Sequence, residues 1–186
     1  QRGVDDVRIQ RAVEAVRARL CNMVYVHCPG WTAERIAADA AQLRARYGVD
    51  LIVVDYLGKI AYGDYQRGFN EASMIAQQVE TLKIMAERLG VPVILGSQVN
   101  REFKATADKR PTLNDLKGSG GIEEKANAVV ILYEPNPRVP GATSVTLEAH
   151  VEKNEGGPCG TVMLEHALGR FRVYDPAPEP EWRLED

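Results

Sequence analysis

The sequence predicts an α/β fold in which a mostly parallel sheet is flanked by helices and is followed by antiparallel hairpin strands. Two apolar runs without alternation, 51–54 and 91–95, are typical of strands that are covered on both faces. A long segment with helical spacing, 71–89, separates them, so strand, helix and strand form one βαβ unit. From residue 144 onward, apolar and polar residues alternate, which indicates half-exposed antiparallel strands.

Helices are indicated by capping residues as well as by apolar spacing. Residues 4–20 have a loosely helical pattern. Thr32 can cap a second helix that Gly48 ends, and Asn70 can cap a third that Gly90 ends. Each of the last two helices carries one apolar stripe, so we expect it to pack on the sheet through that face.

The remaining strands are expected where short apolar runs recur. Residues 128–132 predict a third strand of the parallel sheet. The other expected strands are 23–26 (short and buried), 144–152, 161–164 and 171–174, with a hairpin turn at 153–158. Residues 1–174 are expected to form one domain, and 175–186 a tail rich in Pro and Glu.

Composition narrows the functional class. The 186 residues are 45% hydrophobic and 26% charged, which is ordinary for one globular domain. No run is long and apolar enough for a membrane span, and the three cysteines have no pairing pattern, so a cytoplasmic protein without disulfides is expected. The net charge of -3 argues against a general nucleic-acid binder, so any DNA contact must come from local loops.

Two polar residues follow the predicted parallel strands. Asp55 ends the run 51–54, and Gln98 follows the run 91–95. Ligands of open parallel sheets collect at this carboxyl edge. The carboxylate is suited to hold a water of a hydrated Mg²⁺, and the amide to sense a phosphate or an attacking water. Alternatively, Asp55 caps the following loop and Gln98 satisfies backbone groups.

Four motifs resemble one family when they are taken together and in order. They are LIVVDYL at 51–57, VPVILGSQVNR at 91–101, KRPTLNDLKGSGGIE at 109–123 and KNEGGPCGTV at 153–162. Each is similar to a motif in the RecA-like ATPase domain of DnaB-like replicative DNA helicases. The resemblance extends over residues 20–175, and four motifs in order are far more specific than one.

The resemblance implies roles for three residues of a site that binds ATP and Mg²⁺. Asp55 would be the Walker B carboxylate that holds Mg²⁺ through water. Gln98 would link the nucleotide to loops that face DNA. Lys153 would reach across a subunit boundary to a neighbour's γ-phosphate, which implies a homo-oligomeric ring, expected to be a hexamer.

The resemblance also implies contacts with single-stranded DNA, and a primase or helicase loader as further partners. Glycines in the 109–123 motif would let backbone N–H groups approach phosphate oxygens. The loop 58–69 combines basic and aromatic residues, as stacking surfaces do, although a loop packed under a helix would have the same composition. The candidate DNA-binding residues are Lys59, Arg67, Arg101, Lys117, Gly118 and Gly120.

The sequence departs from the family pattern in three ways. The strand that carries the family's catalytic glutamate would lie before residue 1. The chain contains no G-x-x-x-x-G-K-[ST] phosphate-binding loop, so we expect a motor domain truncated before the Walker A motif and inactive by itself. Glu155 stands where the family has an arginine finger, and a carboxylate facing a neighbour's triphosphate would repel it. Either Lys153 serves alone, or Arg170 or Arg172 substitutes, or the protein is a weak relative.

Three functions are therefore open. The first is an ATP-hydrolysing replicative helicase motor that translocates on single-stranded DNA as a ring and unwinds duplex DNA. The second is a non-catalytic module that binds DNA or a partner helicase. The third, a RecA-like ATPase of the recombination or clock type, is disfavoured by the 109–123 motif.

Overall fold

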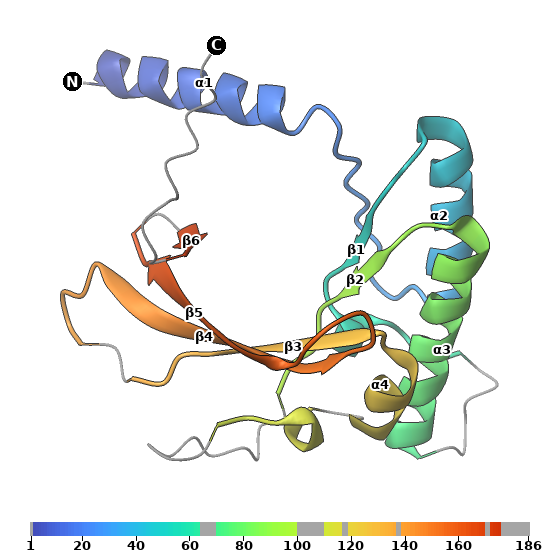
Figure 1. The fold of residues 1–186 in the computed structure, drawn as a ribbon. Coiled ribbons are helices and arrows are strands. Elements are labelled where there is room, and N and C mark those ends of the chain that lie inside the picture. The colour runs from blue at the N-terminus through green and yellow to red at the C-terminus, as the bar shows by residue number, and fades with distance from the viewer. Residues whose placement is uncertain are drawn as a thin grey trace, which may run out of the picture.

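The computed structural model describes residues 2–63, 70–99, 110–116, 119–136, 139–169 and 172–175. Figure 1 shows a helical layer beside a small sheet, with a long curved hairpin crossing below them. The elements in chain order are α1 (Arg2–Arg19), α2 (Ala33–Tyr47), β1 (Ile52–Val54), η1 (Leu57–Lys59), α3 (Glu71–Leu89), β2 (Val93–Leu95), η3 (Leu113–Asp115), α4 (Ser119–Lys125), β3 (Ala128–Tyr133), β4 (Ser144–Asn154), β5 (Gly160–Ala167) and β6 (Arg172–Tyr174).

The expected caps begin and end α2 and α3. The Thr32 side chain accepts a hydrogen bond from the backbone of residue 35, and the Asn70 side chain accepts one from residue 73. Gly48 and Gly90 end these helices with φ values of 67° and 60°, the left-handed region that a side chain disfavours. The sequence predicts both helices within a few residues because capping chemistry is local.

The sheets differ in part from the expectation of a mostly parallel arrangement. Within the described residues, β1 and β2 form the only parallel pair of strands, with Ile52 opposite Val93 and Val54 opposite Leu95. The strand β3, predicted as a third parallel strand, instead begins a four-stranded antiparallel sheet in the order β3-β4-β5-β6. The reason is that β4 hydrogen-bonds along the whole of β3, and this pairing is not visible in the apolar pattern of β3 alone.

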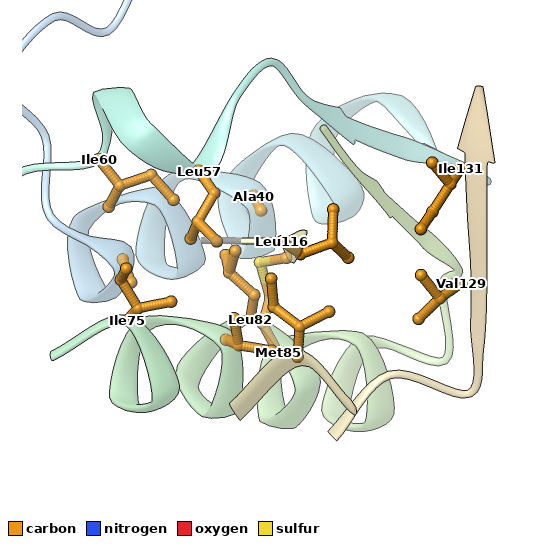
Figure 2. Close-up of a cluster of buried hydrophobic side chains, with 12 residues drawn as sticks. Ala40, Leu57, Ile60, Ile75, Leu82, Met85, Leu116, Val129 and Ile131 are labelled. Atoms are coloured by element: carbon orange, nitrogen blue, oxygen red, sulfur yellow. The ribbon is translucent and has the colours of Figure 1, made fainter. Parts of the chain in front are cut away.

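The apolar core lies between α2, α3 and the inner faces of the strands (Figure 2). Helix α3 contributes Ile75, Leu82 and Met85, which are at most 5% exposed, and β3 contributes Val129 and Ile131. In a closely packed interior of this kind, replacing a side chain with a shorter one removes several van der Waals contacts. The core therefore fixes the sheet edge and the segment around α4 relative to each other.

Two predictions about buried strands are wrong. The expected strand 23–26 is irregular, and Tyr25 is 78% exposed, because no described segment offers it a strand partner. The strands β1 and β2 are covered on one face only, since Val53 and Ile94 are 62% and 56% exposed. Helix α1 also extends away from the core, and its described side chains are exposed (Figure 1).

Within the described residues, no helix combines the length and apolar character needed to cross a membrane.

Candidate functional site

The carboxyl ends of β1 and β2 form one edge of the parallel sheet. The backbone N–H of Gly96 donates to the Val54 carbonyl at 3.0 Å, and that of Leu57 donates to the Gly96 carbonyl at 2.8 Å. A β-carbon added to Gly96 would lie 3.6 Å from the Asp55 carboxylate and 3.2 Å from the Tyr56 β-carbon. The Asp55 side chain therefore lies beside the end of the neighbouring strand, within ordinary contact distance of a β-carbon at position 96, whereas Tyr56 would be the residue that such a β-carbon crowds.

Gln98 lies beyond the end of β2, on the same edge as Asp55. Both residues are exposed, and the two strands are in parallel register up to Val54 and Leu95. The next residue along the chain, Val99, forms an antiparallel bridge with Leu116. The segment that carries Gln98 is thus joined directly to the 109–123 motif.

The first part of the loop 58–69 is hydrogen-bonded to a buried side-chain amide on α3. Gln78, on α3, is 3% exposed and donates to the carbonyls of Ile60 and Ala61 at 3.2 and 3.3 Å. Lys59, at the end of η1, remains exposed next to this anchor. Arg67 lies outside the described residues. Gln78 is not among the residues selected from the sequence, because a lone glutamine in a helix carries no local signal.

The glycines at the start of α4 have different surroundings. Gly120 is exposed, and an added β-carbon would meet no atom within 4 Å. A β-carbon on Gly121 would lie 2.6 Å from both the α- and β-carbons of Ala76, because α4 packs tightly on α3 there. Only Gly120 of these two is therefore open to a ligand. The other candidates of this group, Lys117, Gly118 and Arg101, lie outside the described residues.

The turn of the β4–β5 hairpin carries a network of charged groups that the chain satisfies internally. Lys153 donates through Nζ to the Glu123 carbonyl at 2.9 Å and lies 3.0 Å from Glu155 Oε1. Asn127 donates from Nδ2 to the other Glu155 oxygen at 2.6 Å, and its carbonyl accepts from the Glu155 backbone at 2.9 Å. Lys83 donates to the Asn127 side chain at 2.5 Å. The ammonium of Lys153 is thus bound to its own chain.

The charge of Glu155 is stabilised by the same contacts. The hydrogen bond from Asn127, followed by that from Lys153, holds the pKa of the Glu155 carboxyl below its ordinary value. Glu155 remains half exposed, so solvent screens this pairing. Glu155 stands at the position where the resemblance predicts an arginine finger, and the structure pairs its carboxylate with Lys153 of the same chain.

Arg172, one of the two arginines considered as substitutes, does not adjoin Lys153. Residue 172 pairs with Ala167, which pairs with Ser144 at the start of β4. Lys153 lies nine residues further along the same strand, a distance of roughly 30 Å at the usual rise per residue. Arg172 is therefore at the opposite end of the hairpin, and Arg170 lies outside the described residues.

The sheet edge is compatible with a hydrated divalent cation. Mg²⁺ in nucleotide sites keeps several waters and needs only one or two protein carboxylates, which Asp55 could provide. The described residues contain no group of three or more metal-binding side chains, and the sequence has no phosphate-binding loop. The sheet edge thus presents a carboxylate that such a cation could use, while the sequence contains no G-x-x-x-x-G-K-[ST] motif.

A family model described as the DnaB-like helicase C terminal domain matches residues 4–173. Among curated relatives, the replicative DNA helicase DnaB of Leifsonia xyli subsp. xyli (strain CTCB07) is 32% identical over 186 residues, covering 96% of this chain and 39% of that protein. DnaB of Mycobacterium leprae (strain TN) is 33% identical over 155 residues, covering 80% of this chain and 24% of that protein. The chain thus spans well under half the length of these relatives.

Two solved structures resemble the fold. One is an ATPase domain that superposes with a TM-score of 0.68 at 27% identity, covering 78% of this chain and 52% of that one. The other is a DnaB-like replicative helicase, solved in a study of its interactions with primase. It gives a TM-score of 0.63 at 29% identity, covering 73% of this chain and 32% of that one. A mixed α/β fold with one parallel and one curled antiparallel sheet is thus shared with an ATPase domain.

Proposed function

The chain belongs to the family of DnaB-like helicase C-terminal domains, and we propose that it is the motor part of a replicative DNA helicase that hydrolyses ATP. Residues 1–174 would form the motor unit and 175–186 a tail rich in Pro and Glu. The intact protein would supply a Walker A loop, assemble as a ring, expected to be hexameric, translocate on single-stranded DNA and unwind the duplex. A primase is a further proposed partner, because one of the similar helicases interacts with primase.

The observation that carries this proposal is the shared edge of β1 and β2. Asp55 and Gln98 both follow adjacent parallel strands there, which is where open α/β sheets bind ligands. Asp55 would orient the waters of Mg²⁺, and Mg²⁺–ATP would supply the phosphoryl group whose transfer releases free energy. Gln98 would contact the γ-phosphate, and its displacement would move Val99. Because Val99 is bridged to Leu116, the segment that contains Leu116 would move as well.

Lys153 would act on the site of the neighbouring subunit. To do so its ammonium would leave the Glu123 carbonyl and Glu155, then approach the γ-phosphate and offset charge in the transition state. A site completed in trans requires head-to-tail packing, which closes into a ring if the rotation allows. On the basis of the sequence, Arg170 is a further residue proposed to contact the nucleotide.

Basic residues and glycines that face the central channel of the proposed ring would bind the DNA. Lys59 and the exposed Gly120 are the described candidates, and the glycine leaves room for a phosphate to approach the backbone. Phosphate contacts of this kind carry no base preference and weaken with added salt. The proposal extends to Arg67, Arg101, Lys117 and Gly118 on the basis of the sequence.

The test uses the intact protein with its phosphate-binding loop. Asp55→Asn should lower ATP turnover by about 100-fold or more, because a neutral amide orients hydrated Mg²⁺ poorly. Asp50→Asn is the matched control, since Asp50 is an exposed carboxylate at the other end of β1 and contacts only Arg44 within the described residues. Equal turnover in both variants would contradict the assignment.

A second candidate function, a non-catalytic module that binds DNA or a partner helicase, is favoured by one observation. Lys153 is held by Glu155 and the Glu123 carbonyl of its own chain, and the sequence has no arginine at the neighbouring position 155. This function predicts that the intact protein binds single-stranded DNA without hydrolysing ATP. Measuring both properties on one preparation separates the two functions.

A further inference from the structure

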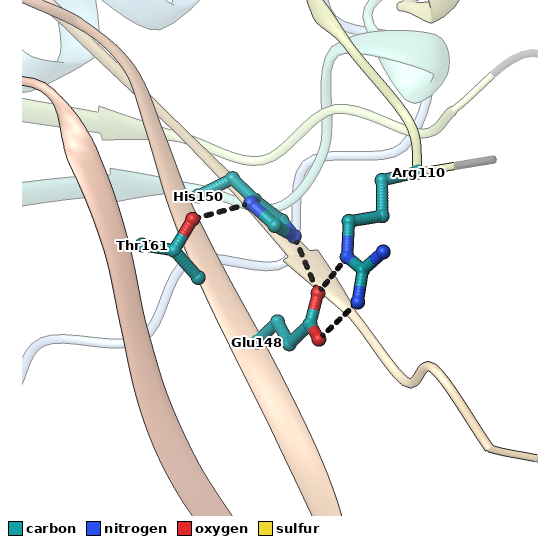
Figure 3. Close-up of polar contacts among 4 residues, drawn as sticks. All are labelled: Arg110, Glu148, His150 and Thr161. Atoms are coloured by element: carbon teal, nitrogen blue, oxygen red, sulfur yellow. Dashed lines mark hydrogen bonds and ion pairs between the residues drawn. The ribbon is translucent and has the colours of Figure 1, made fainter. Parts of the chain in front are cut away.

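An ion pair between the half-exposed Arg110 and the buried Glu148 joins the segment before α4 to the middle of β4. The Arg110 guanidinium contacts both carboxylate oxygens of Glu148, with Nε 2.6 Å from Oε2 and Nη2 2.9 Å from Oε1 (Figure 3). Glu148 is 5% exposed, although it lies in a strand whose alternation predicts an outward position. Two parallel hydrogen bonds from a guanidinium to a carboxylate fix the relative orientation of the two groups as well as their distance.

The pair continues into the hairpin through a histidine. His150 Nε2 lies 2.9 Å from Glu148 Oε2, and His150 Nδ1 lies 2.9 Å from the Thr161 hydroxyl on β5 (Figure 3). The hydrogen bond from Arg110 lowers the pKa of the Glu148 carboxyl, which stays charged and accepts from both sides. The Glu148 carboxylate is thus oriented by His150 on β4, which also contacts β5, and by Arg110 from the segment before α4.

Strand β4 is also tied to this segment at a second point. Lys153 lies five residues after Glu148 and donates to the Glu123 carbonyl at the end of α4. The segment from Arg110 to Glu123 is therefore attached to one strand near both of its ends. Between these attachments lies the region proposed to contact DNA, including Gly120. One of the attachments is made by the residue proposed to reach the neighbouring nucleotide.

Building on the proposed function, we propose that Arg110 and Glu148 are positioning residues that hold residues 110–116 and helix α4 to strand β4 as one body. Once Lys153 has left the Glu123 carbonyl to engage a neighbour's nucleotide, the Arg110–Glu148 pair remains as the link through which a displacement of the hairpin moves the DNA-facing segment. Arg110 and Glu148 contact neither nucleotide nor DNA in this arrangement. Their role is to make DNA binding and ATP turnover depend on each other, which is a coupling between two sites.

A role in stability alone is the alternative, and it predicts different measurements. Removing Arg110 leaves the buried Glu148 carboxylate without its two guanidinium contacts, whereas removing both charges avoids that penalty. The double variant Arg110→Gln with Glu148→Gln therefore keeps the fold more readily than Arg110→Gln alone. Arg110→Lys retains the charge but loses the two-pronged contact. Arg44→Gln is the matched control, because it removes a surface pair with Asp50 at a 2.9 Å contact remote from α4.

The experiment measures ATP turnover of the intact protein with and without a single-stranded oligothymidylate, together with thermal unfolding. In the double variant, turnover without DNA should stay within about twofold of wild type, while stimulation by DNA falls at least about fivefold. Arg110→Lys should lie between, and Arg44→Gln should match wild type in both assays.

Two outcomes overturn the positioning role alone: a double variant that is stimulated as strongly as wild type, or one that loses turnover equally with and without DNA. If the double variant does not fold, full stimulation of Arg110→Lys has the same consequence. Wild-type protein that binds DNA but shows no stimulated turnover contradicts the proposed motor function, and the positioning role falls with it.

Discussion

The edge of the β1–β2 sheet and the turn of the β4–β5 hairpin differ in whether their charged side chains have partners within the chain. At the sheet edge, the Asp55 carboxylate is exposed and makes no hydrogen bond or ion pair with other described residues. At the hairpin, Lys153 and Glu155 contact each other and the residues around α4. A group left without partners is ready for a ligand, whereas a satisfied group must first exchange its contacts. The predictions below test this difference.

The largest expected effect comes from removing the hairpin cation. Lys153→Ala in the intact protein should lower ATP turnover by about 100-fold, since charges that act on the transferring phosphoryl group contribute at least this much. Lys83→Ala is the control, because Lys83 belongs to the same network but lies on α3. Steady-state turnover of both variants provides the comparison, and a Lys153→Ala protein as active as Lys83→Ala would show that the hairpin does not take part.

The next effect concerns the two glycines of α4. Gly121→Ala should lower the free energy of unfolding by about 1–3 kcal/mol, because its β-carbon would overlap Ala76 on α3. Gly120→Ala meets open space and should leave stability unchanged or slightly raised, while weakening DNA binding under the proposed function. Denaturant unfolding and DNA titration measure these effects. Equal loss of stability in both variants would contradict the packing of α4 on α3.

A smaller effect is expected from neutralising the hairpin carboxylate. Glu155→Gln should raise ATP turnover by about two- to fivefold, the range expected for releasing an exposed ion pair, because Lys153 becomes easier to detach. Glu152→Gln, which changes the residue on the other side of Lys153 in the sequence, is the control. Turnover that falls in Glu155→Gln would mean that Glu155 holds Lys153 in its working position.

The smallest effect is a pH dependence of stability. The pKa of Glu148 is lowered in the folded state below its ordinary 4.5, chiefly by the Arg110 hydrogen bond. Its contribution is therefore present above the unfolded-state pKa and is lost as the pH falls through the lower folded-state value. Wild-type and Glu148→Gln proteins should differ in unfolding free energy by a constant amount near neutral pH and converge in acid. A difference that grows in acid would contradict this.

Local chemistry explains which parts of the fold could be predicted from the sequence. The caps Thr32, Asn70, Gly48 and Gly90 involve residues that are neighbours in the chain, so the pattern predicts α2 and α3 closely. The run 23–26 has the composition of a strand, but a strand exists only with a partner, which the run itself does not specify. The pairing of β3 with β4 escapes prediction for the same reason.

The candidate site shows the same division between local and distant information. The positions of Asp55 and Gln98 beyond adjacent strands follow from their place after two apolar runs. The burial of Glu148 and His150 could not be predicted, because alternation gives two faces without saying which one meets the core. On β4, the partner of Glu148 is Arg110, which lies 38 positions away in the chain. Gln78 carries no signal because its carbonyl partners lie in a loop far along the chain.

The most direct test of the account is binding of Mn²⁺, as a spectroscopic substitute for Mg²⁺, to the intact protein in the presence of ATP. Electron paramagnetic resonance should detect a bound ion in wild type and Asp50→Asn, and an affinity at least about tenfold weaker in Asp55→Asn. Equal affinity in all three proteins would show that the Asp55 carboxylate at the edge of the β1–β2 sheet does not hold the metal of a nucleotide site.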